Sequence, residues 1–192
     1  MKQFFLACVL ISIFLSQISC KSSRYITEQY IKNNIEDHQP ENTSSIRTYS
    51  IFKGNTANTG RYLELTGYKF NFKKGLVIGA DRSYITRKIS SRAGTITEAE
   101  TYIDYIQLDL DQCSAILTNY KTLQDRLKKE KPRSSEEVYH DYTVSKDCFI
   151  SFRKSGNGDG SGIEYVNFWV KGEKYRINTN LFVKKLKQFL EY

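Results

Sequence analysis

The segment TYIDYIQLDLDQCSAILTNYKTLQDRLKKE, residues 101–130, changes its hydrophobic period near its middle, and this change decides the fold class. As far as Leu110, apolar and polar side chains alternate, which is typical of a strand covered on one face. Asp111 is suited to cap a following helix, and Lys128 and Lys129 suit the negative end of its dipole. The apolar residues after Asp111 recur at the spacing of one helix face: Cys113, Ile116, Tyr120, Leu123 and Leu127. The segment therefore predicts a strand followed by an amphipathic helix that lies across a sheet.

The flanking sequence predicts further strands and one further helix. Alternation with a period of two marks strands at residues 46–53, 62–72, 76–78, 84–89, 138–144, 148–153, 163–170 and 175–177. We expect hairpin turns at residues 73–75 and at Lys171-Gly172, and a loop at residues 90–95. A final helix, capped by Thr179 or Asn180, carries an apolar stripe of Phe182, Val183, Leu186, Phe189 and Leu190. The predicted class is α+β: an antiparallel β-sheet meander with two amphipathic helices packed on it.

The composition indicates one basic domain. The chain has 192 residues and a formal net charge of +8 at pH 7, and no joint rich in Pro, Gly and Ser divides residues 46–192. The densest basic run, residues 128–133, is short and interrupted, so it is typical of a solvated helix end rather than a nucleic-acid groove. We therefore expect no nucleic-acid partner. An excess of positive charge favours anionic lipid headgroups, acidic glycans or acidic proteins.

The first twenty residues combine Lys2, an apolar stretch over residues 4–14, and the sequence Leu-Ser-Gln-Ile-Ser-Cys ending at Cys20. This resembles the lipobox of bacterial lipoproteins, with Ser19 and Cys20 matching and Gln17 standing where the family usually carries Leu. The resemblance implies a signal peptide over residues 1–19, lipid on Cys20, and a membrane-anchored protein of the bacterial cell envelope, on the periplasmic side or the cell surface. The alternative is an ordinary secretory signal cleaved near Ser19. Residues 20–45 then form a lipid-anchored tether with a short helix, followed by a single α+β domain over residues 46–192.

The cysteines leave two interpretations open. In an exported chain, Cys113 and Cys148 are the thiols that remain after Cys8 is removed and Cys20 is lipidated. An exported protein is in a compartment that permits disulfides, so the two are either bridged or are separate buried thiols.

Three sets of polar residues have the composition of a reactive or metal site. Cys113, His140 and Asp141 have the residue types of a thiol hydrolase, but ordinary packing accounts for the first two. Asn157, Asp159 and Ser161 alternate as calcium ligands do within a Gly-rich loop, but the first and twelfth positions of a calcium loop fall on Ser155 and Val166. The acidic cluster Asp104, Asp109 and Asp111 has its first two members on opposite strand faces. We therefore predict no catalytic residues, no metal site and no cofactor.

An aromatic surface is the strongest indication of function. Neighbouring strands carry aromatic residues suited to a platform for sugar rings or for a partner's backbone: Tyr62, Tyr68, Tyr165, Trp169 and Tyr175. The leading hypothesis is a noncatalytic binding or structural module for a protein or glycan of the envelope, one variant being an immunity protein that neutralises a toxin there. The alternative is an envelope thiol hydrolase that uses Cys113 and His140.

Overall fold

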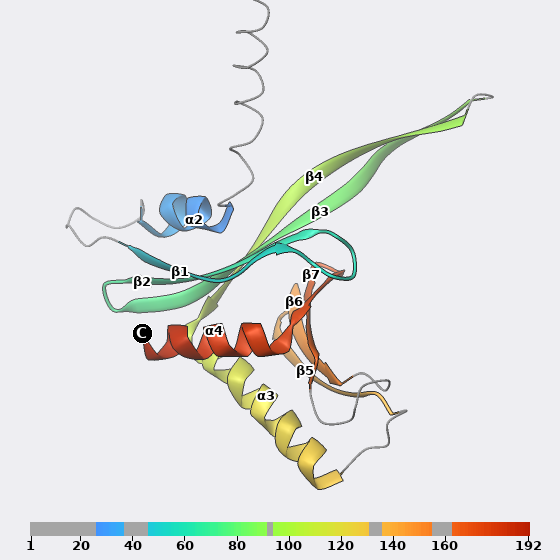
Figure 1. Ribbon diagram of the computed structural model, residues 1–192. Helices are drawn as coiled ribbons and strands as arrows, with labels where there is room; N and C mark the ends of the chain where they lie inside the picture. Colours follow the sequence, from blue (N-terminus) through green and yellow to red (C-terminus); the bar gives the residue numbers. More distant parts are fainter. Residues whose placement is uncertain (1–25, 37–45, 92–93, 131–135, 155–162) are drawn as a thin grey trace, which may run out of the picture.

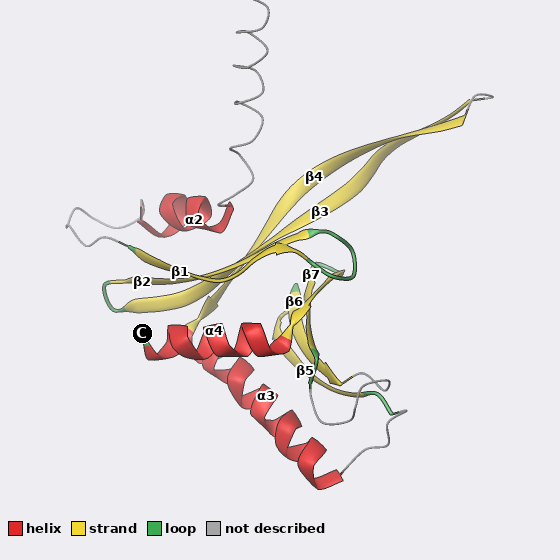
Figure 2. Cartoon of the chain, in the orientation of Figure 1, coloured by secondary structure: helices red, strands yellow, loops and turns green. Residues whose placement is uncertain are grey.

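The computed structural model describes residues 26–36, 46–91, 94–130, 136–154 and 163–192. It holds two antiparallel four-stranded sheets together with helices, so the α+β class is confirmed (Figures 1 and 2). The first sheet has the order β1-β2-β3-β4 and consists of β1 (Arg47–Asn55), β2 (Tyr62–Phe70), β3 (Lys73–Ser91) and β4 (Gly94–Asp109). The second has the order β5-β6-β7-β8 and consists of β5 (Val138–Ser145), β6 (Cys148–Lys154), β7 (Tyr165–Val170) and β8 (Glu173–Asn178). The helices are α2 (Ile26–Ile31), the π-helical turn η1 (Lys32–Glu36), α3 (Leu110–Glu130) and α4 (Thr179–Glu191).

The prediction of a single meander with two helices is wrong in two respects. The strands divide between two sheets, and three α-helices rather than two pack on them in the described residues, the third being the short helix expected in the tether. The division occurs at α3, whose 21 residues carry the chain about 30 Å away from the end of β4 before β5 begins. Alternation shows which side chains of a strand share a face but not which strand lies beside it, so it did not reveal the division.

The strands β3 and β4 form one long hairpin whose distal part projects beyond the rest of the first sheet (Figure 1). The predicted separation of the strands at residues 76–78 and 84–89 is wrong, as is most of the predicted loop at 90–95, because β3 and β4 pair from Gly75 and Asp109 out to Ser91 and Gly94. Gly79 lies within the ladder, and α2 packs directly over it. A Cβ there would lie 2.8 Å from the Thr27 methyl carbon.

The turn between β2 and β3 lies earlier than predicted. Phe70 pairs with Lys73, which leaves Asn71 and Phe72 as the two turn residues. Asn71 has a φ of 52°, and asparagine tolerates this left-handed conformation better than most residues do. The predicted tight turn at Lys171-Gly172 is confirmed, since Val170 pairs with Glu173 around it.

One hydrophobic core joins both sheets to α3 and α4. The predicted stripe of α3 is buried from Cys113 to Leu123, and that of α4 is buried from Phe182 to Phe189. Phe182 meets Phe168 of the second sheet edge-on at a centroid distance of 5.2 Å. At the other end of α4, the Phe189 ring lies against Gly67 of the first sheet, where an added Cβ would be 2.5 Å away. The helix α4 therefore packs on both sheets.

The helix caps lie one or two residues before the predicted positions. Asp109 Oδ1 accepts a hydrogen bond from Gln112 N at 2.7 Å, so Asp109 and not Asp111 caps α3. Asn178 Oδ1 accepts from Leu181 N at 3.1 Å, so Asn178 and not Thr179 or Asn180 caps α4. Each helix begins directly after its last paired strand residue, and the capping side chain must stand just before the first helical residue.

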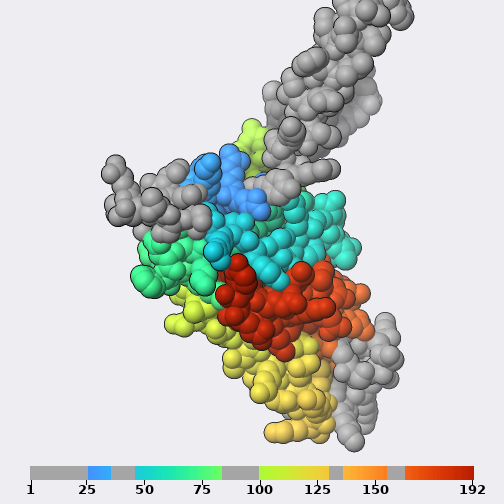
Figure 3. Space-filling model, turned by 60° about the vertical axis from the view of Figure 1, so that its left-hand side comes forward, coloured from blue at the N-terminus to red at the C-terminus, as the bar shows by residue number. Residues whose placement is uncertain are grey.

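The helix α2 covers the face of the first sheet that α4 does not (Figure 3). Ile31 and Ile35 pack with Tyr68 and Val77 in a second buried cluster. The buried carboxylate of Glu64 accepts hydrogen bonds from the Thr27 hydroxyl at 2.7 Å and from Ile26 N at 3.2 Å. The short helix expected in the tether is therefore docked on the domain, and every described element lies within residues 26–192.

We expect the substitution Gly67→Ala to lower the free energy of unfolding by about 1–3 kcal/mol, because the methyl group would overlap the buried Phe189 ring. Urea unfolding followed by circular dichroism measures this loss. Adding Phe189→Leu should make the Gly67→Ala step less costly, because the smaller side chain leaves room. Strictly additive losses in the double variant would contradict the contact.

We expect the isosteric substitution Thr27→Val to destabilise the docking of α2, because the buried Glu64 carboxylate loses a hydrogen-bond donor, at a cost of about 1–3 kcal/mol. Hydrogen exchange should show faster exchange of the α2 amides. Gln29→Ala, at an exposed position of the same helix, is the control and should leave exchange unchanged. Equal exchange in Thr27→Val and the control would show that this bond does not hold the helix.

Candidate functional site

The face of the second sheet that points away from the core carries aromatic and basic side chains from all four strands. Alternate residues of β5 to β8 lie on it, while the residues between them enter the core. The backbone register places them in cross-strand rows. We call this set the aromatic–basic face: Tyr139, Asp141, Phe149, Ser151, Arg153, Tyr165, Asn167, Trp169, Lys174 and Arg176.

The aromatic–basic face is hollowed rather than flat. An open depression of about 320 Å³ lies on it, lined by Tyr139, Asp141, Phe149, Ser151, Arg153, Asn167, Trp169 and Lys174. Its volume is at the lower end of the range of small-ligand sites. All four strands of the sheet contribute to its wall, so the sheet itself positions these side chains.

Aromatic rings form one side of this face. Phe149 pairs with Trp169 across β6 and β7, and their rings stack at a centroid distance of 5.2 Å with an interplanar angle of 15°. The ammonium of Lys174 lies 5.5 Å from the Trp169 ring centroid, and the Arg176 guanidinium lies 5.1 Å from that of Tyr165. These cation–π contacts hold the long basic side chains over the rings.

Polar groups occupy the middle of the face. Ser151 pairs with Asn167, and both are buried although they point away from the core. Asn167 Oδ1 accepts a hydrogen bond from Arg176 Nε at 3.1 Å, which orients both side chains. A hydroxyl and an amide at the floor of a depression supply the donors and acceptors that orient a polar ligand.

The face carries more positive than negative charge. Burial lowers the pKa of Lys174, and the neighbouring Arg176 and Arg153 guanidiniums lower it further. Glu137 forms an ion pair with Arg153, and Asp141 is exposed at the edge strand β5. Because Lys174 and Arg176 remain close to each other and to Arg153, an anion placed among them would relieve their mutual repulsion.

The structure brings together only part of the predicted platform. Tyr165 and Trp169 lie on the aromatic–basic face, as predicted for a shared surface. Tyr175 is fully buried on the opposite side of the sheet, where its hydroxyl donates to Asp81 O at 2.5 Å and burial raises its pKa to about 12. Tyr68 is buried beneath α2, and Tyr62 donates to Glu64 in the first sheet. A platform of all five residues is therefore wrong.

Other members of the face were not predicted. Phe149, Ser151 and Arg153 alternate with the apolar residues Cys148, Ile150 and Phe152, so alternation already indicated a second face for β6. Tyr139, Lys174 and Arg176 were missed because a single exposed residue on an edge strand is ordinary. Only the cross-strand register places them beside the aromatic residues.

The two thiols are separate and inaccessible. Cys113 and Cys148 are free and almost completely buried, which is the unbridged arrangement that the sequence left open. Burial raises the pKa of each thiol to about 12, so neither supplies a thiolate near neutral pH. His140 Nε2 lies 2.7 Å from Asn119 Oδ1 and is engaged with that amide. This geometry gives no support to a thiol hydrolase.

The acidic residues have structural roles. Asp104 pairs with Arg82 at 2.7 Å and with Lys171 at 2.8 Å, which ties the β7–β8 turn to β4. No group of His, Cys, Asp and Glu residues that could hold a metal ion occurs in the described part of the chain. The glycine-rich loop considered for calcium, residues 155–162, lies outside the described residues, as does Cys20.

Comparisons with known proteins gave no match: no family model fits the chain, and none was found among curated proteins or solved structures. None of the described helices combines the length and apolarity that crossing a bilayer requires.

We expect Cys113 and Cys148 to resist alkylation at pH 8 until the chain is unfolded, because the reactive thiolate is scarce when burial raises the pKa to about 12. The test uses a chain that begins at Lys21, in which these are the only cysteines. Intact mass after iodoacetamide treatment, with and without urea, counts the modified thiols. Rapid modification of Cys113 in the folded chain would restore the thiol hydrolase as a candidate, and thiols blocked in urea until reduction would show a disulfide.

Proposed function

We propose that this chain is an exported lipoprotein of the bacterial envelope, anchored through Cys20, and that its aromatic–basic face binds an acidic glycan without chemical conversion. The arrangement of Lys174 and Arg176 over the Trp169 and Tyr165 rings carries this proposal. The row of aromatic rings offers apolar surface against which a sugar ring can pack, and adjacent cations offer a partner for a carboxylate, sulfate or phosphate group.

The shape of the face favours a glycan over a protein. A standard protein interface covers about 800 Å² on each partner, whereas the depression here is small and local. Ser151 and Asn167 at its floor have the hydroxyl and amide groups that pair with sugar hydroxyls. The exposed Tyr139, at 59% relative exposure, extends the surface along β5 for further units of a chain.

The docking of α2 bears on how far the anchored domain would lie from the bilayer. Only residues 21–25 separate Cys20 from α2, and a segment of that length spans at most about 18 Å. Because α2 packs on the first sheet, residues 37–45 of the predicted tether join η1 to β1. They therefore add nothing to the distance between Cys20 and the folded domain. A lipid on Cys20 would hold the domain close to the bilayer surface.

We expect Trp169→Ala and Lys174→Gln each to weaken binding of a polyuronate such as polygalacturonate by about tenfold, because one removes the stacking surface and the other a cation over it. Isothermal titration calorimetry with the chain beginning at Lys21 measures the affinities, and neutral dextran should bind much more weakly. Lys121→Gln, at an exposed position of α3, is the matched charge control.

Equal losses of affinity in Lys121→Gln and Lys174→Gln would show that the binding is nonspecific charge attraction. This result would contradict the proposed site. A different outcome is that the chain does not bind polyuronate but retains an acidic envelope protein, and that Trp169→Ala abolishes this retention. That result would assign the same face to a protein ligand.

A further inference from the structure

A second surface, at the turn between β2 and β3, has a different character. Phe72 stands at this turn with a relative exposure of 107%, against 59% for Tyr139. The ring is fully exposed, so a partner that removed it from water would gain the free energy of burying its apolar surface. The turn is convex, so this partner must accept a single protruding ring.

Basic residues surround Phe72. Arg47 pairs with Lys69 across β1 and β2, and Lys69 pairs with Lys74 across β2 and β3. Like charges directly opposite one another destabilise a sheet. Burial lowers the pKa of Lys74, and the Lys69 ammonium lowers it further. Lys73 directly follows Phe72 and is exposed.

Contacts with α4 hold part of this group in place. Lys74 Nζ donates to Leu190 O at 2.8 Å at the end of α4, where a cation complements the helix dipole. The Lys69 ammonium lies 5.9 Å from the Tyr192 ring centroid, and Arg47 donates to the Tyr192 hydroxyl at 3.4 Å. Figure 3 shows this end of the first sheet beside the end of α4.

Nearby acids do not neutralise the group. Among the described residues, carboxylates form ion pairs with Arg61, Arg82, Lys128, Arg153 and Lys171, and none of these cations belongs to the group around Phe72. The acids closest along the adjoining elements are Glu191, exposed on α4, and Asp109, which is engaged as the cap of α3. The surface therefore keeps a positive charge around an exposed aromatic ring.

We propose that this basic hairpin tip, consisting of Arg47, Lys69, Phe72, Lys73 and Lys74, contacts the surface of an anionic lipid bilayer, with Phe72 entering the headgroup region. A bilayer interface accepts a protruding aromatic ring without a preformed pocket, and the exposed Lys69 and Lys73 beside the ring can reach anionic headgroups. A folded protein would need a matching cavity for Phe72. A glycan would find a single aromatic ring on a convex turn.

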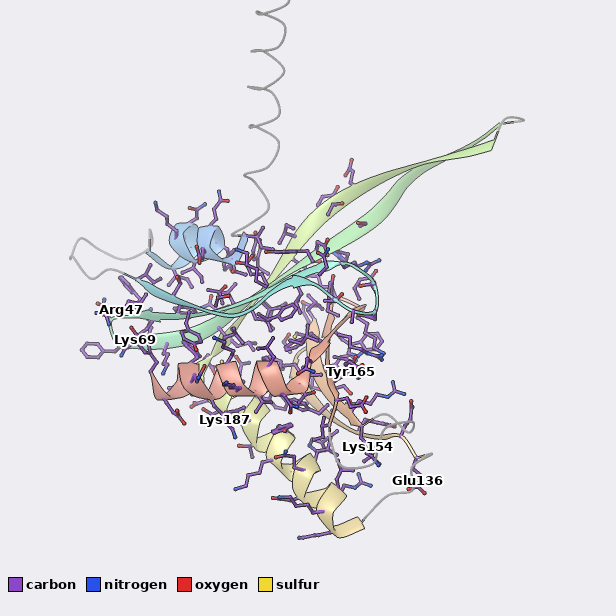
Figure 4. The ribbon with its side chains drawn as sticks, in the orientation of Figure 1. Arg47, Lys69, Glu136, Lys154, Tyr165 and Lys187 are labelled. Atoms are coloured by element: carbon purple, nitrogen blue, oxygen red, sulfur yellow. The ribbon has the colours of Figure 1, made fainter. Side chains whose placement is uncertain are left out.

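The tip is distinct from the proposed glycan site. Figure 4 shows Arg47 and Lys69 at one end of the body of the molecule and Tyr165 toward the other. A domain held by the tip can therefore leave the aromatic–basic face open. A lipid on Cys20 and a basic patch together provide the two attachments that stable membrane association requires. The proposal about the tip stands without the lipid, because it rests on residues of the folded domain.

Co-sedimentation with vesicles tests the tip on a chain that begins at Lys21, which retains every described element and has no lipid or signal peptide. Binding should occur with phosphatidylglycerol–phosphatidylethanolamine vesicles, fall as salt is raised, and be absent with phosphatidylcholine alone. The double substitution Phe72→Ser and Lys73→Gln should reduce the bound fraction at least fivefold, with an unchanged circular dichroism spectrum.

The matched control is the double substitution Leu181→Ser and Lys121→Gln, which also removes one exposed apolar side chain and one exposed lysine. It should bind as the unsubstituted chain does. An equal loss in both double variants, or the absence of binding to anionic vesicles, would overturn the proposal. Polygalacturonate binding by the Phe72→Ser, Lys73→Gln variant should be unchanged, so the two proposals fail separately.

Tryptophan fluorescence locates the contact. Trp169 is the single tryptophan of the chain, and its emission should not shift when anionic vesicles are added. Phe72→Trp should introduce an emission component that shifts to shorter wavelength with the vesicles, because the indole enters a less polar environment. A shift of Trp169 in the unsubstituted chain would place the aromatic–basic face on the bilayer and would contradict the proposed orientation.

Discussion

The fold depends on the apolar stripe of α4, which packs on both sheets at once. Phe182 meets Phe168 of the second sheet, and Phe189 lies against Gly67 of the first, seven residues further along the same helix face. Because α4 packs on one face of each sheet, each sheet has a second face that α4 does not cover. The first sheet carries α2 on its other face, whereas the other face of the second sheet holds the open depression.

The folded chain groups charges that are scattered in the sequence. Lys174 and Arg176 lie on one strand but join Arg153 only through the register of β6, β7 and β8. In the same way, Arg47 and Lys69 become neighbours through pairing of β1 with β2. Basic residues thus gather at two ends of the body of the molecule, and the Arg176 and Arg153 guanidiniums lower the pKa of Lys174 in addition to the lowering by burial.

Most of the elements could be predicted from local pattern, and the errors have a common cause. The stripe from Cys113 to Leu123 was predicted correctly because helical spacing depends only on neighbours in sequence. The single sheet was wrong because pairing is a long-range property, and the caps and the β2–β3 turn were misplaced because element ends depend on where packing stops. Asn71, which tolerates a left-handed φ of 52°, was the local sign of the true turn.

Of the candidate site, the sequence alone determined which residues of each strand share a face, since side chains alternate along a strand. Trp169 and Tyr165 belong together for this reason, and Val166 and Phe168 oppose them. Only the tertiary structure decided which face is covered, because coverage depends on the placement of α2, α3 and α4. Tyr175 and Trp169 are both aromatic residues of neighbouring strands, yet the core buries the first and leaves the second beside Lys174 on an open surface.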